Sequence, residues 1–391
     1  MKRIQDIATF MTDGDWIESD NQSKSGIRLI QTGNIGTGKY LNKEARAKFI
    51  SEETFENLKC TEIFPGDILV SRLPDPVGRA CILPEGLGRT ITAVDCTILR
   101  LNEDLCNRRY LVYYTQSPYY AVQVQGFLAG STRIRISRKN LEKIEIPLHD
   151  KAFQMHVIET FSSMDAAIEN RQRVLTLLDE LVKSRFVEMF GDPVKNPYRW
   201  PKKLLTDLGD CKNGMNFHRD DEGYEIHCLG VGDFQNLSVI SDAEKLPLIS
   251  LDTVPSQEYL LQDEDVVFVR SNGNKKLVGR CVAVYPKDVP TTFSGFCIRF
   301  RKNNKIEIQT KYLLQVLKSD GVKMQMEGRG ANIQNLNQKI LSQVEIPIPP
   351  LSLQTQFSTF VHQVEATKTS VRTQLTALTT LRAKMMQEFF G

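Results

Sequence analysis

The chain of 391 residues contains an internal duplication with a spacing of 200 residues. When residues 130–191 are placed over residues 330–391 without a gap, 15 of the 62 positions are identical. The matches cluster, and they include the run Glu-Ile-Pro at 145–147 and again at 345–347. Earlier in each half, Val-Gly-Arg at 77–79 recurs at 278–280. A repeat of this length constrains the whole fold, because both halves must form the same arrangement of elements.

The end of each half carries a heptad pattern. Apolar residues recur at alternating spacings of three and four, which predicts one amphipathic helix per half with a continuous apolar seam. Roughly 38 residues at a rise of about 1.5 Å make a rod of about 57 Å. A proline precedes each helix, at Pro147 and Pro347, and none interrupts it. The seam residues are Phe161, Met164, Ile168, Leu175, Leu178 and Val182 in the first helix and Val361, Val364, Val371, Leu375, Leu378 and Met385 in the second.

These patterns predict an α+β fold built from two mixed α/β domains and two long helices. The predicted boundaries are 1–150 and 192–350 for the domains, and 151–191 and 351–391 for the helices. A pseudo-two-fold axis between the copies requires the helices to pair as an antiparallel coiled coil. The pair would serve either as simple packing between the domains or as a spacer that holds them at a fixed distance.

Composition places the chain among ordinary globular proteins. The hydrophobic share is 41% and the charged share 25%, and the formal net charge is +3. That small excess lowers the expectation of a polybasic nucleic-acid binder but leaves room for a local basic surface. No apolar run approaches the roughly 18 residues of a membrane span, and the start does not resemble a signal peptide. The eight cysteines form no Cys-x-x-Cys pair, so we expect reduced thiols and a cytoplasmic location.

No complete catalytic motif is present. Residues 33–39 have the spacing Gly-x-x-x-x-Gly-Lys of a phosphate-binding loop, but Tyr40 stands where Ser or Thr would hold magnesium. The Asn-Pro-Tyr run at 196–198 lacks one proline of the Asn-Pro-Pro-Tyr loop of adenine methyltransferases. The five histidines are scattered and have no metal-ligand spacing. We therefore predict no catalytic residue and no metal site, in a chain that does no chemistry by itself.

Several short motifs, in a fixed order, accompany the duplication. They are Asp-Gly-Asp-Trp-Ile-Glu at 13–18, Gly-Asp-Ile-Leu-Val at 66–70, Gly-Ser-Thr-Arg-Ile-Arg-Ile at 130–136, Phe-Gly-Asp-Pro at 190–193, and Ile-Pro-Ile-Pro-Pro-Leu at 346–351 followed by Gln354. Over essentially its whole length, the chain resembles the specificity subunit of type I restriction–modification systems. The start of the first helix departs from the family pattern, because Leu-His-Asp at 148–150 replaces the proline run.

The resemblance implies that each α/β domain is a target recognition domain for one half of a split, asymmetric sequence in double-stranded DNA. It also implies that the helices dock two modification subunits, which methylate adenine N6 with S-adenosylmethionine. Restriction subunits would add the ATP- and magnesium-dependent translocase and nuclease, so no cofactor is expected on this chain. The implied setting is the cytoplasm of a bacterium or archaeon, away from any membrane. The alternative function is a duplicated coiled-coil adaptor that gathers proteins without DNA.

The duplication points to candidate DNA-binding residues. The loop after one apolar run differs between the copies in length and chemistry, at 71–76 and 270–277, whereas its flanks match. Arg, Asn and Lys side chains there could bond base edges, although a solvated hairpin loop is the plain alternative. A basic run at 133–139 alternates as on one strand face and is expected to contact phosphates, unless it is only an exposed polar face. Arg79 and Arg280, in matched scaffold, could instead be structural. The candidates are Arg72, Arg79, Arg133, Arg135, Arg138, Lys139, Arg270, Asn272, Asn274, Lys275, Lys276 and Arg280.

Overall fold

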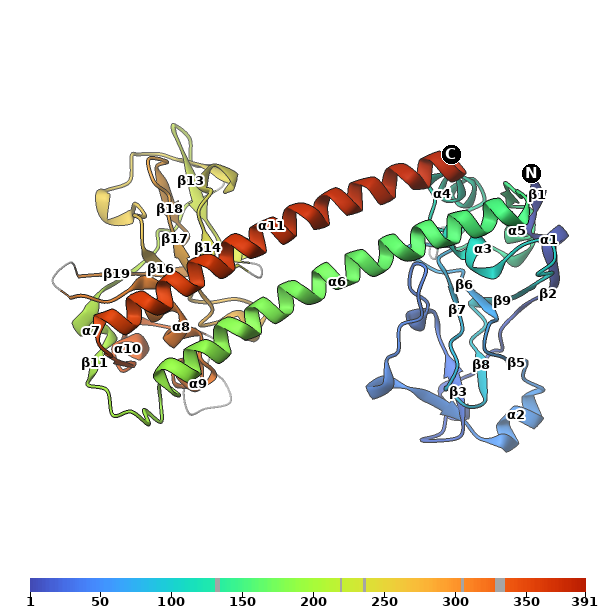
Figure 1. Cartoon of the computed structure of the whole chain (residues 1–391), viewed down its shortest axis with the longest axis horizontal. Helices are drawn as coiled ribbons and strands as arrows, with labels where there is room; N and C mark the ends of the chain where they lie inside the picture. The colour runs from blue at the N-terminus through green and yellow to red at the C-terminus, as the bar shows by residue number, and fades with distance from the viewer. Residues whose placement is uncertain (131–133, 219, 235–236, 304–305, 328–334) are drawn as a thin grey trace. The chain divides into compact units, whose positions relative to one another are not determined.

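A computed structural model describes residues 1–130, 134–218, 220–234, 237–303, 306–327 and 335–391. The chain forms two compact units, and each contains part of both long helices (Figure 1). Unit 1 comprises Met1–Arg173 with Arg372–Gly391, and unit 2 comprises Val174–Val371. The helices are α6 (Lys151–Phe190) and α11 (Leu351–Phe390), each of 40 residues. Within the described residues, no helix combines the length and the apolar character needed to cross a membrane.

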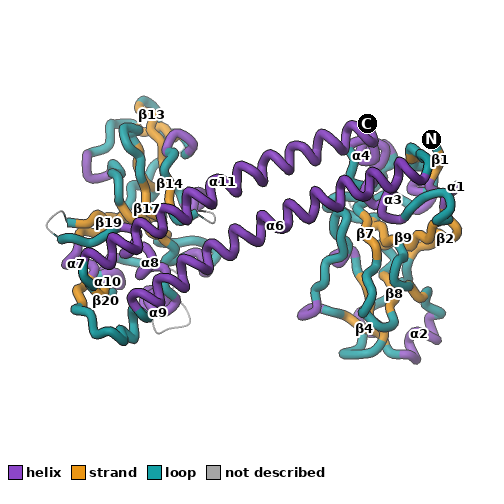
Figure 2. Tube along the Cα trace, viewed as in Figure 1, coloured by secondary structure: helices purple, strands orange, loops and turns teal. Residues whose placement is uncertain are grey.

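The α/β part of unit 1 contains two four-stranded sheets and a short strand pair (Figure 2). One sheet has the order β2-β9-β6-β7 and is antiparallel throughout, whereas the other, β4-β3-β8-β5, contains one parallel pair, β3 with β8. The strands are β1 (Lys2–Arg3), β2 (Ala8–Asp13), β3 (Ile27–Ile30), β4 (Lys48–Ile50), β5 (Glu62–Ile63), β6 (Ile68–Ser71), β7 (Ala80–Ile82), β8 (Thr90–Thr92), β9 (Cys96–Leu101) and β10 (Glu145–Ile146). The helices are α1 (Ile4–Ile7), α2 (Glu52–Leu58), α3 (Arg108–Tyr114), α4 (Pro118–Gly126) and α5 (Arg138–Leu141).

Unit 2 repeats this plan with one strand more in its first sheet and one strand fewer in its second. The sheet orders are β12-β19-β16-β17-β14 and β15-β13-β18, and β11 pairs with β20 as β1 pairs with β10. The strands are β11 (Lys202–Leu204), β12 (Gly209–Asn213), β13 (Tyr224–Leu229), β14 (Val239–Ile240), β15 (Leu248–Leu251), β16 (Asp265–Val269), β17 (Cys281–Val284), β18 (Thr291–Phe293), β19 (Cys297–Lys302) and β20 (Glu345–Pro347). The helices are α7 (Leu205–Leu208), α8 (Thr310–Lys318), α9 (Asp320–Glu327) and α10 (Gln338–Leu341).

A buried carboxylate marks the start of the central strand in each unit. Asp67 precedes β6 and receives two hydrogen bonds from Arg100, at 2.8 and 2.9 Å. Asp265 begins β16 and receives the same pair from Arg301, at 2.8 and 2.7 Å. Each carboxylate also accepts a backbone N–H three residues before it. A bidentate pair of this kind tolerates little displacement, so it fixes β6 against β9 and β16 against β19.

The long helices bury the seam that the heptad pattern predicts. Every seam residue is buried or half-buried, and most positions between them are exposed. In unit 1 the start of α6 lies beside the end of α11, where the Phe161 and Phe389 ring centroids are 5.7 Å apart. In unit 2 the end of α6 lies beside the start of α11, where Phe186 and Phe357 are 5.5 Å apart. Both pairings are antiparallel, and the predicted fold class is confirmed.

The last turn of α11, which belongs to the second repeat, completes the core of unit 1. The last turn of α6, which belongs to the first repeat, completes the core of unit 2. Phe390, which ends α11, is 2% exposed and packs 5.3 Å from the ring of Tyr110 in unit 1. Phe190, which ends α6, packs 4.8 Å from the ring of Tyr312 in unit 2. The hydroxyls of Tyr110 and Tyr312 donate to the carbonyl oxygens of Pro147 and Pro347, at 2.6 and 2.8 Å. Each repeat therefore contributes the end of its long helix to the core around the other repeat's α/β domain.

The first turn of each helix is fixed by a buried glutamine. The Gln154 carboxamide accepts from the Asn107 backbone N–H at 2.8 Å and donates to the carbonyls of Leu105 and His149. Gln354 likewise accepts from the Gln309 N–H at 3.0 Å and donates to the Pro349 carbonyl. In the first copy, where the proline run is missing, the Asp150 carboxylate accepts from the Phe153 N–H and caps the helix. Both helices thus begin at matching positions despite different local sequences.

We expect Phe390→Ala to destabilise unit 1 by about 3–5 kcal/mol, because it leaves a cavity against Tyr110 and Tyr114. Hydrogen exchange followed by mass spectrometry should show lost protection in α3 and unchanged protection in α8. The matched variant Phe190→Ala should give the opposite pattern, and the exposed neighbour Glu388→Ala should change neither. Loss of protection in α8 with Phe390→Ala would contradict the exchanged arrangement.

Candidate nucleic-acid interface

The loop that follows β16 in unit 2 is a structured turn with exposed cations. The Asn272 side-chain oxygen accepts from the Asn274 N–H at 2.7 Å, and that of Asn274 accepts from the Lys276 N–H at 3.2 Å. These bonds cap a short 3-10 turn, residues 275–277, which presents Lys275 and Lys276 at the surface. Asn272 is half-buried, and Asn274 is exposed. The structure therefore brings these four predicted residues together on one surface turn.

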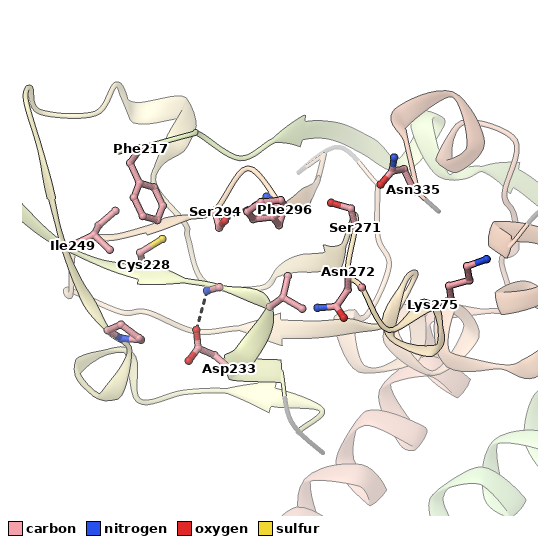
Figure 3. Close-up of a pocket in the computed structure, with 14 residues that line it drawn as sticks. Phe217, Cys228, Asp233, Ile249, Ser271, Asn272, Lys275, Ser294, Phe296 and Asn335 are labelled. Carbon is pink, nitrogen blue, oxygen red and sulfur yellow. Dashed lines mark hydrogen bonds between the residues drawn. The ribbon is translucent and has the colours of Figure 1, made fainter. Parts of the chain in front are cut away.

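This turn borders a cavity of about 770 Å³. Figure 3 shows Phe217, Cys228 and Ile249 toward one end of it and Ser271, Asn272 and Asn335 toward the other. Phe296 lies between these groups and has 63% of its surface exposed. Aromatic faces beside amide, hydroxyl and ammonium groups provide stacking and hydrogen bonding together, which is the chemistry that nucleobases require. The cavity therefore offers groups that can bind a nucleobase.

Sequence reasoning missed Phe217, Phe296 and Asn335. One signal was available, because the Asn-Gly at 213–214 repeats the Asp-Gly at 13–14. A Cβ on Gly214 would lie 2.1 Å from the Ser294 carbonyl oxygen, and one on Gly14 would lie 2.3 Å from that of Thr92. Both glycines thus let the following segment pass close to the sheet. In unit 1 that segment displays Trp16, which is 69% exposed and donates to Glu18 at 3.1 Å.

Arg72 and Arg79 are buried inside unit 1, and for Arg72 this burial favours a structural role over the predicted contact with DNA. Each is only 8% exposed. The Arg79 guanidinium donates to the carbonyl oxygens of Ile35, Leu73, Pro76 and Thr32, at 2.6 to 2.9 Å. Arg72 donates to the Val94 carbonyl at 2.7 Å and lies 3.5 Å from the Asp13 carboxylate. For Arg79 the structure favours the alternative, a structural role, because its donors are used inside the domain. Burial lowers the pKa of Arg79.

The matching arginines of unit 2 are only partly used in this way. Arg270 is half-buried and donates to the Gly295 carbonyl at 3.2 Å, as Arg72 does to Val94. Its side chain therefore supports the turn rather than extending from it. Arg280 is half-buried and lines a different cavity of unit 2, so the structure does not bring it to the candidate interface.

The basic run near the base of the first long helix is not one strand. Arg133 lies outside the described residues, and Arg135 is exposed in a single bridge to Ala129. Ser137 caps α5, so Arg138 and Lys139 stand in its first turn. The expected strand alternation is wrong there, because the Ser137 hydroxyl oxygen accepts from the Asn140 N–H and begins a helix. Arg138 pairs with Glu142 at 3.4 Å, whereas Lys139 and Arg135 remain exposed.

Metal-ligating side chains are not clustered in the part of the chain that the structure describes. Among those residues, no set of three or more His, Cys, Asp or Glu side chains is placed to hold a metal ion. Seven cysteines are buried, and burial raises the pKa of Cys81 and of Cys96 to about 12. Such thiols stay protonated near neutral pH and are poor nucleophiles.

Comparison with known proteins agrees with this geometry. The sequence profile of the family described as "Type I restriction modification DNA specificity domain" matches residues 1–177 and 197–380. The chain is 23% identical over 299 residues to the type I restriction enzyme StySPI specificity subunit of Salmonella potsdam, which covers 72% of this chain and 63% of that one. It is 22% identical over 199 residues to the EcoKI specificity subunit of Escherichia coli K12, covering 48% and 42%. The chain thus spans less than two thirds of the length of these curated relatives.

Solved structures show the same fold. One is a chain from a study described as "Structural basis underlying complex assembly and conformational transition of the type I R-M system", with a TM-score of 0.62, 15% identity, and coverage of 100% of this chain and 97% of that one. Another is the type I restriction–modification S subunit from M. genitalium, with a TM-score of 0.53, 15% identity, and coverage of 100% and 95%. These likenesses define a class of protein with two α/β domains and two long helices. This chain belongs to the type I restriction modification DNA specificity domain family.

The two kinds of arginine should respond differently to the same substitution. Arg79→Gln leaves buried carbonyl oxygens without donors, and we expect it to lower the free energy of unfolding by about 2–4 kcal/mol. Arg135→Gln removes the same charge from an exposed position and should change that free energy by less than about 0.5 kcal/mol. Urea denaturation of both variants is the measurement. Equal losses would show that Arg79 has no special structural role.

Proposed function

We propose that this chain is the DNA sequence-recognition subunit of a type I restriction–modification complex. Each unit would read one half of a bipartite, asymmetric site in double-stranded DNA. The two long helices would hold the two readers at a fixed separation, as dimer geometry fixes half-site spacing in other DNA-binding proteins. The chain would specify the site and leave the chemistry to other subunits.

One observation carries this proposal: the same scaffold is present twice with different loops. The Asp–Arg pairs, the glutamines at the helix starts and the tyrosines against the helix ends recur in both units. The loop at 71–76 contains a buried arginine, whereas the loop at 270–277 presents amides and lysines beside a cavity. A common frame with diverged loops is what two domains need when they read different bases.

The partners in this proposal follow from family membership. Modification subunits, two per chain, would bind the helices and methylate adenine N6 with S-adenosylmethionine. Restriction subunits would supply the ATP- and magnesium-dependent translocation and cleavage. In this proposal the chain is non-catalytic by itself and acts in the cytoplasm of the cell.

Replacing residues 270–277 with the shorter loop 71–76 should change the second half-site only, because the loop belongs to unit 2. The chain would be expressed with its neighbouring modification subunit in a methylation-free host, and N6-methyladenine mapped across the genome. The wild type should give one split, asymmetric motif. A change in both half-sites, or in neither, would sink the loop assignment. No motif at all, with the modification subunit folded and bound, would favour the adaptor function.

Two substitutions in the same turn separate base contact from phosphate contact. Asn272→Ala should cost about 1–3 kcal/mol on the preferred sequence and relax specificity at one base position. Lys276→Gln should weaken binding to all sequences alike and reduce the slope of log K against log salt by about 1. Fluorescence anisotropy with the assembled methyltransferase at several salt concentrations measures both. An unchanged base preference in Asn272→Ala would remove that residue from the interface.

A further inference from the structure

Unit 2 contains a second cavity, of about 560 Å³, on the side of its α/β domain that faces the long helices. It is lined by α8 and α9, by the segments that lead into β14 and β17, and by parts of α6 and α11 that belong to the same unit. Its charged lining is one-sided: six cations face two carboxylates, an excess of four positive charges. The cations are Lys183, Arg280, Lys311, Lys318, Lys323 and Lys368, and the carboxylates are Asp179 and Glu365.

Both carboxylates are already engaged by one lysine. The Lys368 ammonium lies 2.5 Å from Asp179 and 2.8 Å from Glu365, and this residue is only 3% exposed. Among the described residues that line the cavity, no third carboxylate offsets the remaining positive charge. The lining as a whole therefore keeps an excess of positive charge.

Lys318 shows the electrostatic cost of this arrangement. Its ammonium donates to the Ser238 hydroxyl at 2.7 Å and is held beside Arg280 and Lys368. Burial lowers the pKa of Lys318, and these two cations lower it further, against the opposing effects of Cys281 and Glu365. Like charges that lie close together in a concave site repel one another, and a bound anion would offset this repulsion.

The corresponding place in unit 1 provides an internal comparison. A cavity of about 390 Å³ lies between α3 and the long-helix segments of that unit. Its charged lining is almost balanced, with Lys39, Arg109 and Arg382 against Asp165 and Glu169. Tyr110 of α3 and Tyr312 of α8 make the same hydrogen bond, which sets the register between the two helices. In that register Gln116 stands where unit 2 has Lys318, so the scaffold does not require the excess charge.

We propose that the basic cavity of unit 2 binds a compact polyphosphate anion, with the chemistry of a nucleotide's phosphate chain. Three to four negative charges match the excess of four positive ones, and the volume lies within the roughly 300–1,000 Å³ of small-ligand sites. Leu237, Val239 and Leu314 provide an apolar wall for the rest of such a ligand. A DNA duplex, whose major groove alone is about 12 Å wide, cannot enter a cavity of this size. This site is separate from the turn at 270–277 and does not depend on the proposed function.

The test uses the full chain and inorganic tripolyphosphate as the probe, with isothermal titration calorimetry at low salt. Saturable binding of one tripolyphosphate per chain is the expected result. Lys318→Gln should weaken it at least about tenfold, as expected for loss of a charge-assisted contact. This substitution copies the amide that unit 1 carries at the matching position, so the fold should survive, which circular dichroism checks. The matched control Arg109→Gln removes one charge from the unit 1 cavity and should leave the affinity unchanged.

A second variant and two competitors test whether the anion binds in this cavity and not along the DNA-binding surface. Lys311→Gln, on α8, should also weaken tripolyphosphate binding, so the proposal does not rest on one side chain. Excess duplex DNA should fail to displace the probe, whereas ATP without magnesium should displace it. The proposal is overturned by any of three results: no saturable binding, equal weakening in Arg109→Gln, or displacement by duplex DNA. None of these results bears on methylation of a split motif, so the two proposals fail separately.

Discussion

The packing of each helix end against the other repeat's tyrosine is the interaction on which the architecture depends. Phe390 closes the core around Tyr110, and Phe190 closes the core around Tyr312. Removing a phenylalanine side chain of this kind from water contributes about 1.5–3 kcal/mol, so neither helix end separates from its unit at low cost. Gln154 and Gln354 hold the starts of α6 and α11, so each long helix is anchored at its start in one unit and at its end in the other. The antiparallel pairing then follows from connectivity rather than from the seam alone.

The second constraint is that ion pairs inside the two α/β domains hold the strands in register. The Asp67–Arg100 and Asp265–Arg301 pairs are bidentate, and their carboxylates are almost fully buried. Breaking a buried pair costs far more than its net contribution to stability, because it leaves an uncompensated charge. Such a pair therefore holds strand register while the loops beside it change in length and composition. This explains how the turn after β16 differs from that after β6 without disturbing the sheets.

The duplication, the two long helices and their seam could be predicted because each produces a regular repeat in the sequence. The burial of Arg72 could not, since it depends on the carbonyl oxygen of Val94, which is distant in the sequence. The same limit hid the cavity beside the turn at 270–277, which Phe217 and Phe296 both line although no local pattern in the sequence connects them. The turn at 270–277 could be predicted as a candidate because the two copies of the repeat differ there in length and chemistry. A hydroxyl at 137 that caps α5 was enough to overturn the strand expected for Arg138.

Arg79 and Arg280 show how a duplicated scaffold can separate two roles of one residue. They occupy the same place in the repeated Val-Gly-Arg motif, yet Arg79 gives its donors to four carbonyl oxygens and Arg280 lines the basic cavity. The chain's net charge of +3 conceals this difference, because charges on distant surfaces cancel in a sum but not in a cavity. The positive and negative side chains that line the corresponding cavity of unit 1 nearly balance, so the shared fold does not need the additional lysines of unit 2. The additional positive charge in unit 2 is therefore not required by the shared scaffold, which supports the anion site that we propose.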